Sequence, residues 1–464
     1  MRFAIYVALL LSILPFVLLR PFFGLCVYYV VSLLQPKYIA WHPAFQDAMI
    51  VGVPLVVGAI LIGVKRRELI PQREVLTGRP VGVRERIVQG TMFEPAWPLA
   101  VCALLLVYIS VTRLLVPYPL ENNADLYRAL IKIMFVTALV TGMASDHRRL
   151  RILYIVVALS TAFWAIKGGL KMLVLGPHQI YGKNYDNNFF ALTSVMTLPM
   201  VFYFALSVRS ARWRNLLMVC SALICLGIIG SHSRAGFVAF AFVMMGMAWT
   251  YCHRVRALAA VVFVVIVTTI ATGPEIRERI DSIFNYREDN SARSRFATWA
   301  VAGDLLWQSP VIGVGFNNFE LARREFDGGR KAAHNIYLQN LAELGLLGHP
   351  LWLLLVFGSL FSMYRFMRWS RRLPVDLRWA HYWSRGLFLG MCAFCIHGLF
   401  HNEEYLELMF AMVGLHMALK IATRRELQSR KLLSTVQPAR RTRRRGETPA
   451  PRPRALHPAH LFPA

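Results

Sequence analysis

Residues 273–335 read GPEIRERIDSIFNYREDNSARSRFATWAVAGDLLWQSPVIGVGFNNFELARREFDGGRKAAHN. This stretch of mixed charge interrupts a chain that otherwise consists mostly of apolar runs near 20 residues long. Runs of that length cross a lipid bilayer as helices. The sequence therefore predicts an all-α polytopic integral membrane protein with one large polar loop, 274–334, that contains short helices.

The overall composition supports the membrane class. The chain has 464 residues, of which 56% are hydrophobic, and a mean hydropathy of +0.46. The short alternating segments of a membrane barrel are absent from the sequence. The formal net charge of +27 is concentrated in short loops between apolar runs, which is the pattern of cytoplasmic loops. We therefore expect membrane lipids, and not nucleic acid, as partners.

The expected spans number about 12–13 and fall within residues 1–420. The first two could form one tight hairpin around Arg20 and Pro21. The candidate spans are 3–19, 21–35, 46–64, 96–115, 128–145, 151–168, 188–208, 215–231, 235–251, 256–272, 348–365, 382–400 and 404–420.

These spans place every basic loop on one side of the membrane. The positive-inside rule assigns that side, with the C-terminus, to the cytoplasm. The large loop, Arg234 and the segment 183–188 then face the outside. The large loop carries as many acidic as basic residues, which suits a folded cap. The tail 421–464 is rich in Arg and Pro, so we expect it to be disordered, either solvated or lying on anionic headgroups.

The motif Ser231-His232-Ser233-Arg234 falls where one span ends on the outside and the next begins. Ser231 or Ser233 can cap the new helix, whose first turn presents free N–H groups and the positive end of the dipole. With Arg234 as a fixed cation, this arrangement suits a phosphate. The alternative is an arginine that reaches the interface beside a capping serine.

The middle of the large loop holds a second group of cations. A helix is expected around Trp299, with Arg293 and Arg295 in its first turns. Two guanidinium groups at this position could hold a diphosphate through paired hydrogen bonds. Gly313-Val-Gly315 reads as a turn and is only weak evidence for phosphate binding.

His334 lies where the polar loop meets the next helix. A histidine near neutral pH can accept a proton, as a general base must; the alternative is an ordinary interfacial histidine. Glu343 lies within an apolar helical stretch, so it is expected to have a partner or a role. His397, His401 and Glu404 near the last loop are weaker candidates.

The segment 182–188, GKNYDNN, offers Lys183 and the amide of Asn188 to sugar hydroxyls. The alternative is a turn with a helix cap. The sequence has no DxD motif, no Walker loop and no zinc spacing. The run from Cys392 to His397 is CxxCxH within a span, which does not match a metal or haem motif. We expect no metal and no cofactor.

The order of these motifs along the chain, and their expected position on the outer side of the membrane, resemble the O-antigen ligase and O-antigen polymerase superfamily. The resemblance covers roughly residues 1–420 and rests on SxSR at 231–234, R-x-x-x-W at 295–299, P-x-x-G-x-G at 310–315 and His334. The segments 20–41 and 186–199 look closer to one subgroup, the O-glycosylation ligases that accompany exosortase systems.

This resemblance implies a bacterial inner-membrane glycosyltransferase with a GT-C-like helical fold. Such enzymes move a glycan from undecaprenyl diphosphate to an acceptor glycan, lipid or protein on the periplasmic face, without a metal. By carry-over, His334 is the base, and Arg234 and Arg295 bind the diphosphate, with Arg293 as the alternative to Arg295. Ser231, Ser233, Trp299, Lys183, Asn188 and Glu343 are expected to support the site or contact sugar.

Three other functions remain open at this point. A polymerase of the same superfamily differs mainly in its acceptor. A transporter or lipid flippase predicts charged residues inside spans and a repeat between halves, neither of which is clear. A membrane peptidase would need a nucleophile beside a base, and the adjacent pair Cys252 and His253 falls on the cytoplasmic side.

Overall fold

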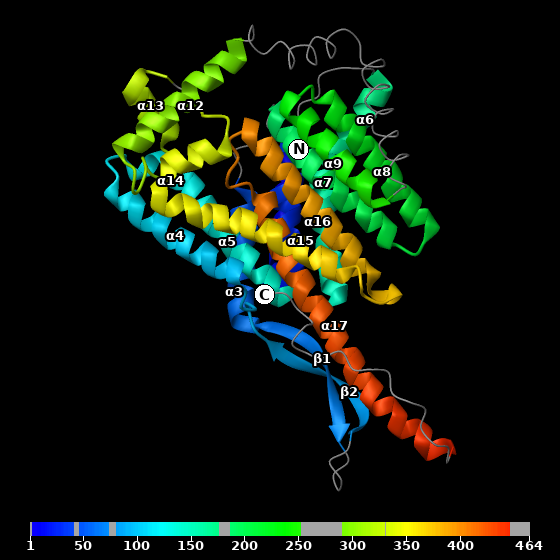
Figure 1. Ribbon diagram of the computed structural model, residues 1–464. Coiled ribbons are helices and arrows are strands. Elements are labelled where there is room, and N and C mark those ends of the chain that lie inside the picture. The colour runs from blue at the N-terminus through cyan, green and yellow to red at the C-terminus, as the bar shows by residue number, and fades with distance from the viewer. Residues whose placement is uncertain are drawn as a thin grey trace.

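A computed structural model describes residues 2–40, 46–73, 80–175, 186–251, 290–329 and 331–445. Helices dominate these residues, and one two-stranded hairpin accompanies them (Figure 1). Backbone groups in a bilayer can bond only within the protein, which is why long apolar runs become helices. The all-α polytopic class expected from the sequence is confirmed.

The first half of the chain contributes six helices and the hairpin. The elements are α1 (Arg2–Leu19), α2 (Pro21–Tyr29) with a π-helical turn (Val30–Leu34), α3 (Asp47–Ile62), β1 (Val64–Arg73), β2 (Pro80–Gly90), α4 (Trp97–Leu115), α5 (Ala124–Met143) and α6 (His147–Leu175).

The second half adds the central helices and the folded loop. The elements are α7 (Asn187–Ser207), α8 (Ala211–Gly230), α9 (Arg234–Tyr251), α12 (Asn290–Gln308), α13 (Phe319–Asp327), α14 (Ile336–Leu353), α15 (Ser359–Ser370), α16 (Arg378–His397), the short 3-10 helix η6 (Gly398–Phe400) and α17 (Glu407–Arg445).

The observed helices follow the expected spans closely. Among the described residues, eight helical segments are long and apolar enough to cross a membrane, and three shorter apolar helices accompany them. The break at Arg20 separates α1 from α2 as two helices. The expected span 256–272 lies outside the described residues. In the apolar stretch of α7, 78% of the residues are buried inside the protein, so α7 is central. In contrast, α1 exposes most of its apolar residues.

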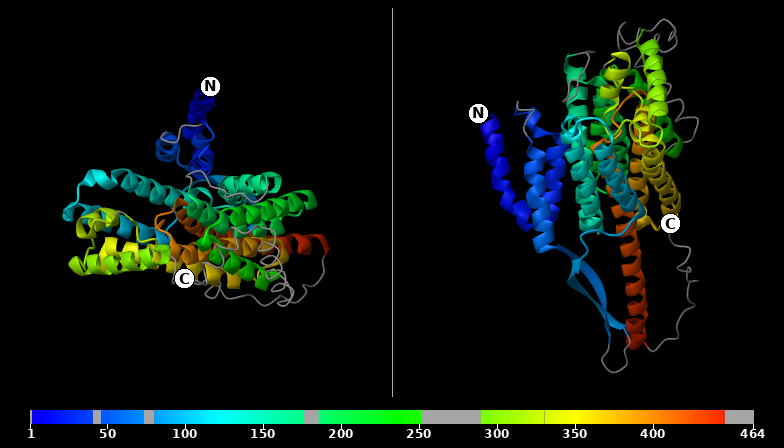
Figure 2. Two further views of the ribbon diagram at one scale, coloured as in Figure 1. Left: turned by 90° about the horizontal axis from the view of Figure 1, so that it is seen from above. Right: turned by 90° about the vertical axis from the view of Figure 1, so that its left-hand side faces the viewer.

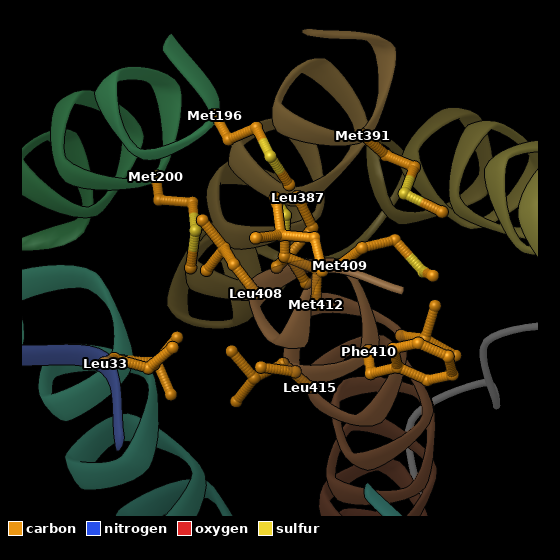
Figure 3. Close-up of a cluster of buried hydrophobic side chains, with 14 of the residues drawn as sticks. Leu33, Met196, Met200, Leu387, Met391, Leu408, Met409, Phe410, Met412 and Leu415 are labelled. Atoms are coloured by element: carbon orange, nitrogen blue, oxygen red, sulfur yellow. The ribbon is translucent and has the colours of Figure 1, made fainter. Parts of the chain in front are cut away.

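Methionine and leucine side chains fill the space between the central helices. Met196 and Met200 of α7 lie near Leu387 of α16, whereas Met391 of the same helix points away from α7 (Figure 3). The side chains that α17 adds to this cluster are Leu408, Met409, Met412 and Leu415. Unbranched Met side chains fit irregular gaps between crossing helices. This packing fixes α7, α16 and α17 relative to one another.

The bundle has two distinct ends. At one, which we call the loop end, α12 and α13 lie over the helix ends, and Asn123 Nδ2 donates to the Phe316 carbonyl at 2.7 Å. At the other, the hairpin end, β1, β2 and the second half of α17 extend away from the bundle (Figures 1 and 2). Basic loops line a cavity of about 1070 Å³ at this end, including Arg151, Arg209 and Arg378. The described basic loops therefore share one end, as the spans predict.

The basic loop 65–90 differs from its expectation. It forms an antiparallel hairpin in which Val64 pairs with Gly90 and Ile70 with Arg84. The β-branched residues of these strands favour extended backbone, and contact with α17 along β2 gives the ribbon a partner.

The expected disorder of the tail is wrong for residues 421–445, because α17 continues to Arg445. Extending a helix that has already formed orders one residue for each hydrogen bond gained, which is easier than starting a new helix. Arg425 also pairs with Glu94, and Arg430 pairs with Asp376. These contacts tie the helix to the hairpin end. Residues 446–464 lie outside the described part of the chain.

Candidate functional site

Two serines shape the turn between α8 and α9. Ser231 Oγ donates to the Ile228 carbonyl at 2.6 Å and accepts from the Ser233 amide at 3.2 Å. Ser233 Oγ accepts from the Gly236 amide at 3.0 Å and so caps α9. His232 between them has a φ of 52°. Arg234 is therefore the first residue of α9, at the positive end of its dipole.

The start of α7 lies against this turn. Ser233 Oγ donates to Asn188 Oδ1 at 2.7 Å, and Asn187 Nδ2 donates to the Ser231 carbonyl at 3.2 Å. Asp186 caps α7 by accepting from the amides of Asn188 and Phe189. Two helix N-termini thus meet at the loop end. Lys183 lies outside the described residues.

His334 is held in a strained backbone conformation directly before α14. Its φ is 50°, in the left-handed region that residues other than glycine rarely occupy. The preceding Ala333 is fixed on both sides: its carbonyl accepts from Trp299 Nε1 at 2.8 Å, and its amide donates to Gln339 Oε1 at 3.1 Å. Asn335 then caps α14. Trp299 is therefore a positioning residue for His334.

Trp299→Phe tests this positioning. The change keeps an aromatic ring but removes the donor to Ala333, so the strained backbone at His334 loses one restraint. We expect kcat to fall about fivefold, as one hydrogen bond is worth roughly 1 kcal/mol, with KM nearly unchanged. Trp307→Phe is the matched control, because Trp307 lies on the same helix and is 82% exposed. Equal kcat values in the two variants would exclude a positioning role.

Charged groups surround the half-buried His334. Burial lowers the pKa of His334, Arg295 and Lys331 lower that pKa further, and Asp186 raises it. His334 is therefore neutral near pH 7 and can accept a proton. Arg295, Lys331 and Asp186 are therefore the charged groups whose influence reaches His334.

The two candidate arginines of the large loop both lie on α12. The Arg295 side chain is partly buried and its charge reaches both His334 and His401. The backbone of Arg293 lies in the first turn of α12, but its side chain lies outside the described residues. Arg295 stays the first candidate because its spacing to Trp299 matches the R-x-x-x-W motif, and Arg293 stays the alternative.

The segment 310–315 is a docking loop for α14. The amides of Val314 and Gly315 donate to the carbonyls of Ala342 and Glu343 at 2.9 and 2.8 Å. Gly313 and Gly345 both have positive φ, and a Cβ on either would lie within 2.6 Å of the facing backbone. These amides are already used, so the weak suggestion of phosphate binding at this turn is wrong.

Glu343 supports the same loop. Its side chain is 1% exposed, and its two oxygens accept from the Asn317 amide at 2.8 Å and from Gln339 Nε2 at 3.3 Å. Gln339 in turn accepts from the Ala333 amide. Glu343 thus has the partners that its buried position requires, and it connects the docking loop to the backbone at His334.

Sequence reasoning gave too little weight to three residues that the fold brings to this site. Asp186 appeared only as part of a polar segment, and His397 and His401 only as weak candidates. The histidines lie close to Arg295 because the end of α16 packs beside the start of α14. No spacing in the sequence indicates this proximity, since more than 60 residues separate His334 from His397.

The arrangement offers the groups that a phosphate ester reaction requires. It combines a cation at a helix N-terminus, a second cation on α12 and an imidazole, His334, that is influenced by the charges of Arg295 and Asp186. Within the described part of the chain, no group of three or more His, Cys, Asp or Glu side chains is arranged to hold a metal ion.

The fold and this site define a polytopic membrane protein with a histidine and arginine site at one end of a helical bundle. The family model described as O-antigen ligase matches residues 216–353. This segment runs from α8 to α14 and contains Arg234, Arg295 and His334, and its match supports the O-antigen ligase superfamily for this part of the chain. No curated protein matches the chain. The superfamily transfers lipid-linked glycans at membranes.

Proposed function

We propose that this protein is a bacterial inner-membrane glycosyltransferase. It moves a glycan from an undecaprenyl-diphosphate donor to an acceptor hydroxyl on the periplasmic face. The observation that carries this proposal is the half-buried His334, fixed at a φ of 50° directly before α14 and influenced by the charges of Arg295 and Asp186. The ligase family match over residues 216–353 supports the class of reaction.

The proposed sidedness rests on the distribution of charge. Basic loops lie at the hairpin end, and such loops are retained on the cytoplasmic side of a membrane. The loop end, with α12, α13 and His334, then faces the periplasm, where lipid-linked glycans are presented. Arg445, the last residue of α17, then lies on the cytoplasmic side, because α17 leaves the bundle at the hairpin end.

The proposed reaction is a single displacement. The acceptor hydroxyl oxygen attacks the anomeric carbon, and its proton passes to an imidazole nitrogen of His334. The bond from the anomeric carbon to the phosphate oxygen breaks, and its electron pair remains on the undecaprenyl diphosphate. Attack from the face opposite this leaving group inverts the anomeric centre.

The leaving diphosphate needs positive charge around it. Arg234 supplies a cation at the positive end of the α9 dipole, and Arg295 supplies a second cation from α12. Donors fixed in advance where charge develops are usually the largest contribution to catalysis. No metal is part of the proposed step.

The acceptor distinguishes a ligase from a polymerase. We favour a ligase of the O-antigen or O-glycosylation type, and the exosortase-associated subgroup remains part of this proposal because of segments 20–41 and 186–199. A polymerase of the same superfamily would use the same site with a growing glycan as acceptor. A transporter fits less well, since the described charged candidates gather at one end of the bundle and not at its centre.

The experiment that tests the function compares a deletion strain with the same strain carrying the wild-type gene. We expect the deletion strain to accumulate undecaprenyl-linked glycan and to lack one class of glycosylated product, visible as a gel shift. The wild-type gene should restore the product. Normal product in the deletion strain would remove glycan transfer as the function.

The pH dependence of transfer should follow the protonation of the His334 imidazole. The base works when neutral, and its pKa lies below the usual 6.5, so activity should fall only as the pH drops below that range. Lys331→Gln removes a charge that lowers the pKa of His334, so the acid limb should move to higher pH. Asp186→Asn removes a charge that raises this pKa, so the limb should move to lower pH.

These two shifts are measured as kcat/KM against pH with a fixed lipid-linked donor. Lys331 is exposed, so its substitution should disturb the fold little. If neither substitution changes the pH of the acid limb of kcat/KM, a group other than His334 is titrating.

A further inference from the structure

Two buried histidines at the loop end lack any partner for their ring nitrogens. His397 ends α16 and His401 follows η6; they are 0% and 3% exposed. Their rings meet edge to face, with centroids 5.5 Å apart. None of the four ring nitrogens has a hydrogen-bond partner among the described residues. Buried polar atoms are nearly always hydrogen-bonded, so four together indicate that a ligand completes them.

The pair lies beside the proposed catalytic base. Tyr337 OH donates to the Cys395 carbonyl at 2.8 Å, and Gly398 packs directly against Ile336. The end of α16 is thereby held against the start of α14, two residues after His334. Burial holds the pKa of His401 at about 4; Asp186 raises that pKa, and His334 and Arg295 lower it. The pair and the base therefore share one charged environment.

The number of donors and acceptors identifies the chemistry of the ligand. A charge on either ring would be buried beside the other imidazole and near Arg295, which favours the neutral form. Each neutral imidazole has one donor and one acceptor nitrogen. A phosphate only accepts, so it would leave two acceptor nitrogens without partners. Sugar hydroxyls donate and accept, so two neighbouring hydroxyls satisfy all four nitrogens.

We propose that His397 and His401 form a sugar-hydroxyl subsite next to His334 and Arg295. This inference rests on the proposed function and extends it to the carbohydrate. The hydroxyls belong either to the sugar next to the donor diphosphate or to an acceptor sugar. In both cases the pair orients the sugar while Arg234 and Arg295 hold the diphosphate.

Phenylalanine variants separate binding from folding. His397→Phe and His401→Phe retain a flat ring but remove nitrogens that have no protein partner, so stability should change little. His401→Gln keeps one donor and one acceptor and should retain part of the function. His416→Phe is the matched control, because His416 is also fully buried but bonds Ser362 on α15, away from the loop end.

The binding probes are undecaprenol, undecaprenyl diphosphate and undecaprenyl diphosphate carrying N-acetylglucosamine, added to the purified full-length protein. Affinity is measured by thermal shift. We expect wild type to bind the diphosphate lipid more tightly than undecaprenol, and the sugar-bearing lipid more tightly still. Each Phe variant should lose roughly threefold to tenfold in affinity for the sugar-bearing lipid alone.

A second arm distinguishes the acceptor sugar. If donor affinities are unchanged in the Phe variants, transfer is measured against increasing acceptor fraction from the deletion strain, and the acceptor KM should rise by a similar factor. Unchanged values in both arms would show that only water occupies the pair, and would overturn the subsite. Equal binding of undecaprenol and its diphosphate by wild type would instead overturn the proposed function, and the subsite with it.

Discussion

His334→Ala is expected to abolish glycan transfer while leaving the protein folded in the membrane. A positioned base contributes about 10²–10⁴ in rate, and alanine cannot accept the acceptor proton. The left-handed backbone at this position is maintained by Trp299, Gln339 and the Asn335 cap, none of which uses the His334 side chain. The measurement compares membranes of the deletion strain carrying wild type or variant by gel shift of the product.

His147→Ala provides the matched control for this result. His147 stacks on Trp379 at the hairpin end, with ring centroids 4.2 Å apart, far from the loop end. It should retain most of the transfer activity. Full activity of the His334 variant would show that the assigned base is wrong, and loss of both proteins from the membrane would point to folding.

Arg295→Gln is expected to lower kcat by about 10²–10³, the usual effect of removing one fixed donor from a developing negative charge. It has a second signature, because Arg295 lowers the pKa of His334. The acid limb of the residual activity should therefore move to higher pH. Arg295→Lys keeps the charge but not the paired hydrogen bonds, so it should recover only part of the rate.

Arg293→Gln distinguishes the two arginines of α12. We expect it to cost less than Arg295→Gln and to leave the acid limb in place, because the influence on His334 comes from Arg295. A larger loss from Arg293→Gln, with a normal Arg295 variant, would move the diphosphate contact to Arg293.

Much of the architecture followed from the sequence because a bilayer imposes strong local rules. Apolar runs of about 20 residues must become helices, and basic loops must collect on one side. The helices α4, α7 and α16 consequently begin or end within a few residues of their expected spans. His334 and Arg234 could be selected because each stands alone at the junction of a polar segment and an apolar helix.

Charge and hydropathy gave no information about pairing across a loop or along an exposed helix. The hairpin β1–β2 and the helical residues 421–445 were therefore missed. Both depend on contacts with elements far away in the chain, such as the pair formed by Arg425 and Glu94. Local composition cannot report such contacts.

The sequence by itself determined the membrane class and the positions of most spans, and it nominated the candidate base and cations, since each is a local property of a short segment. Only the tertiary structure decided which of these residues serve the fold and which remain for a ligand. In the structure, a carboxylate oxygen of Glu343 accepts from the amide of Asn317, and Ser231 Oγ donates within the turn to the Ile228 carbonyl. It left the ring nitrogens of His397 and His401 without hydrogen-bond partners in the part of the chain that the structure describes. The physical reason is that hydrogen-bond satisfaction depends on neighbours in space, which helix packing sets.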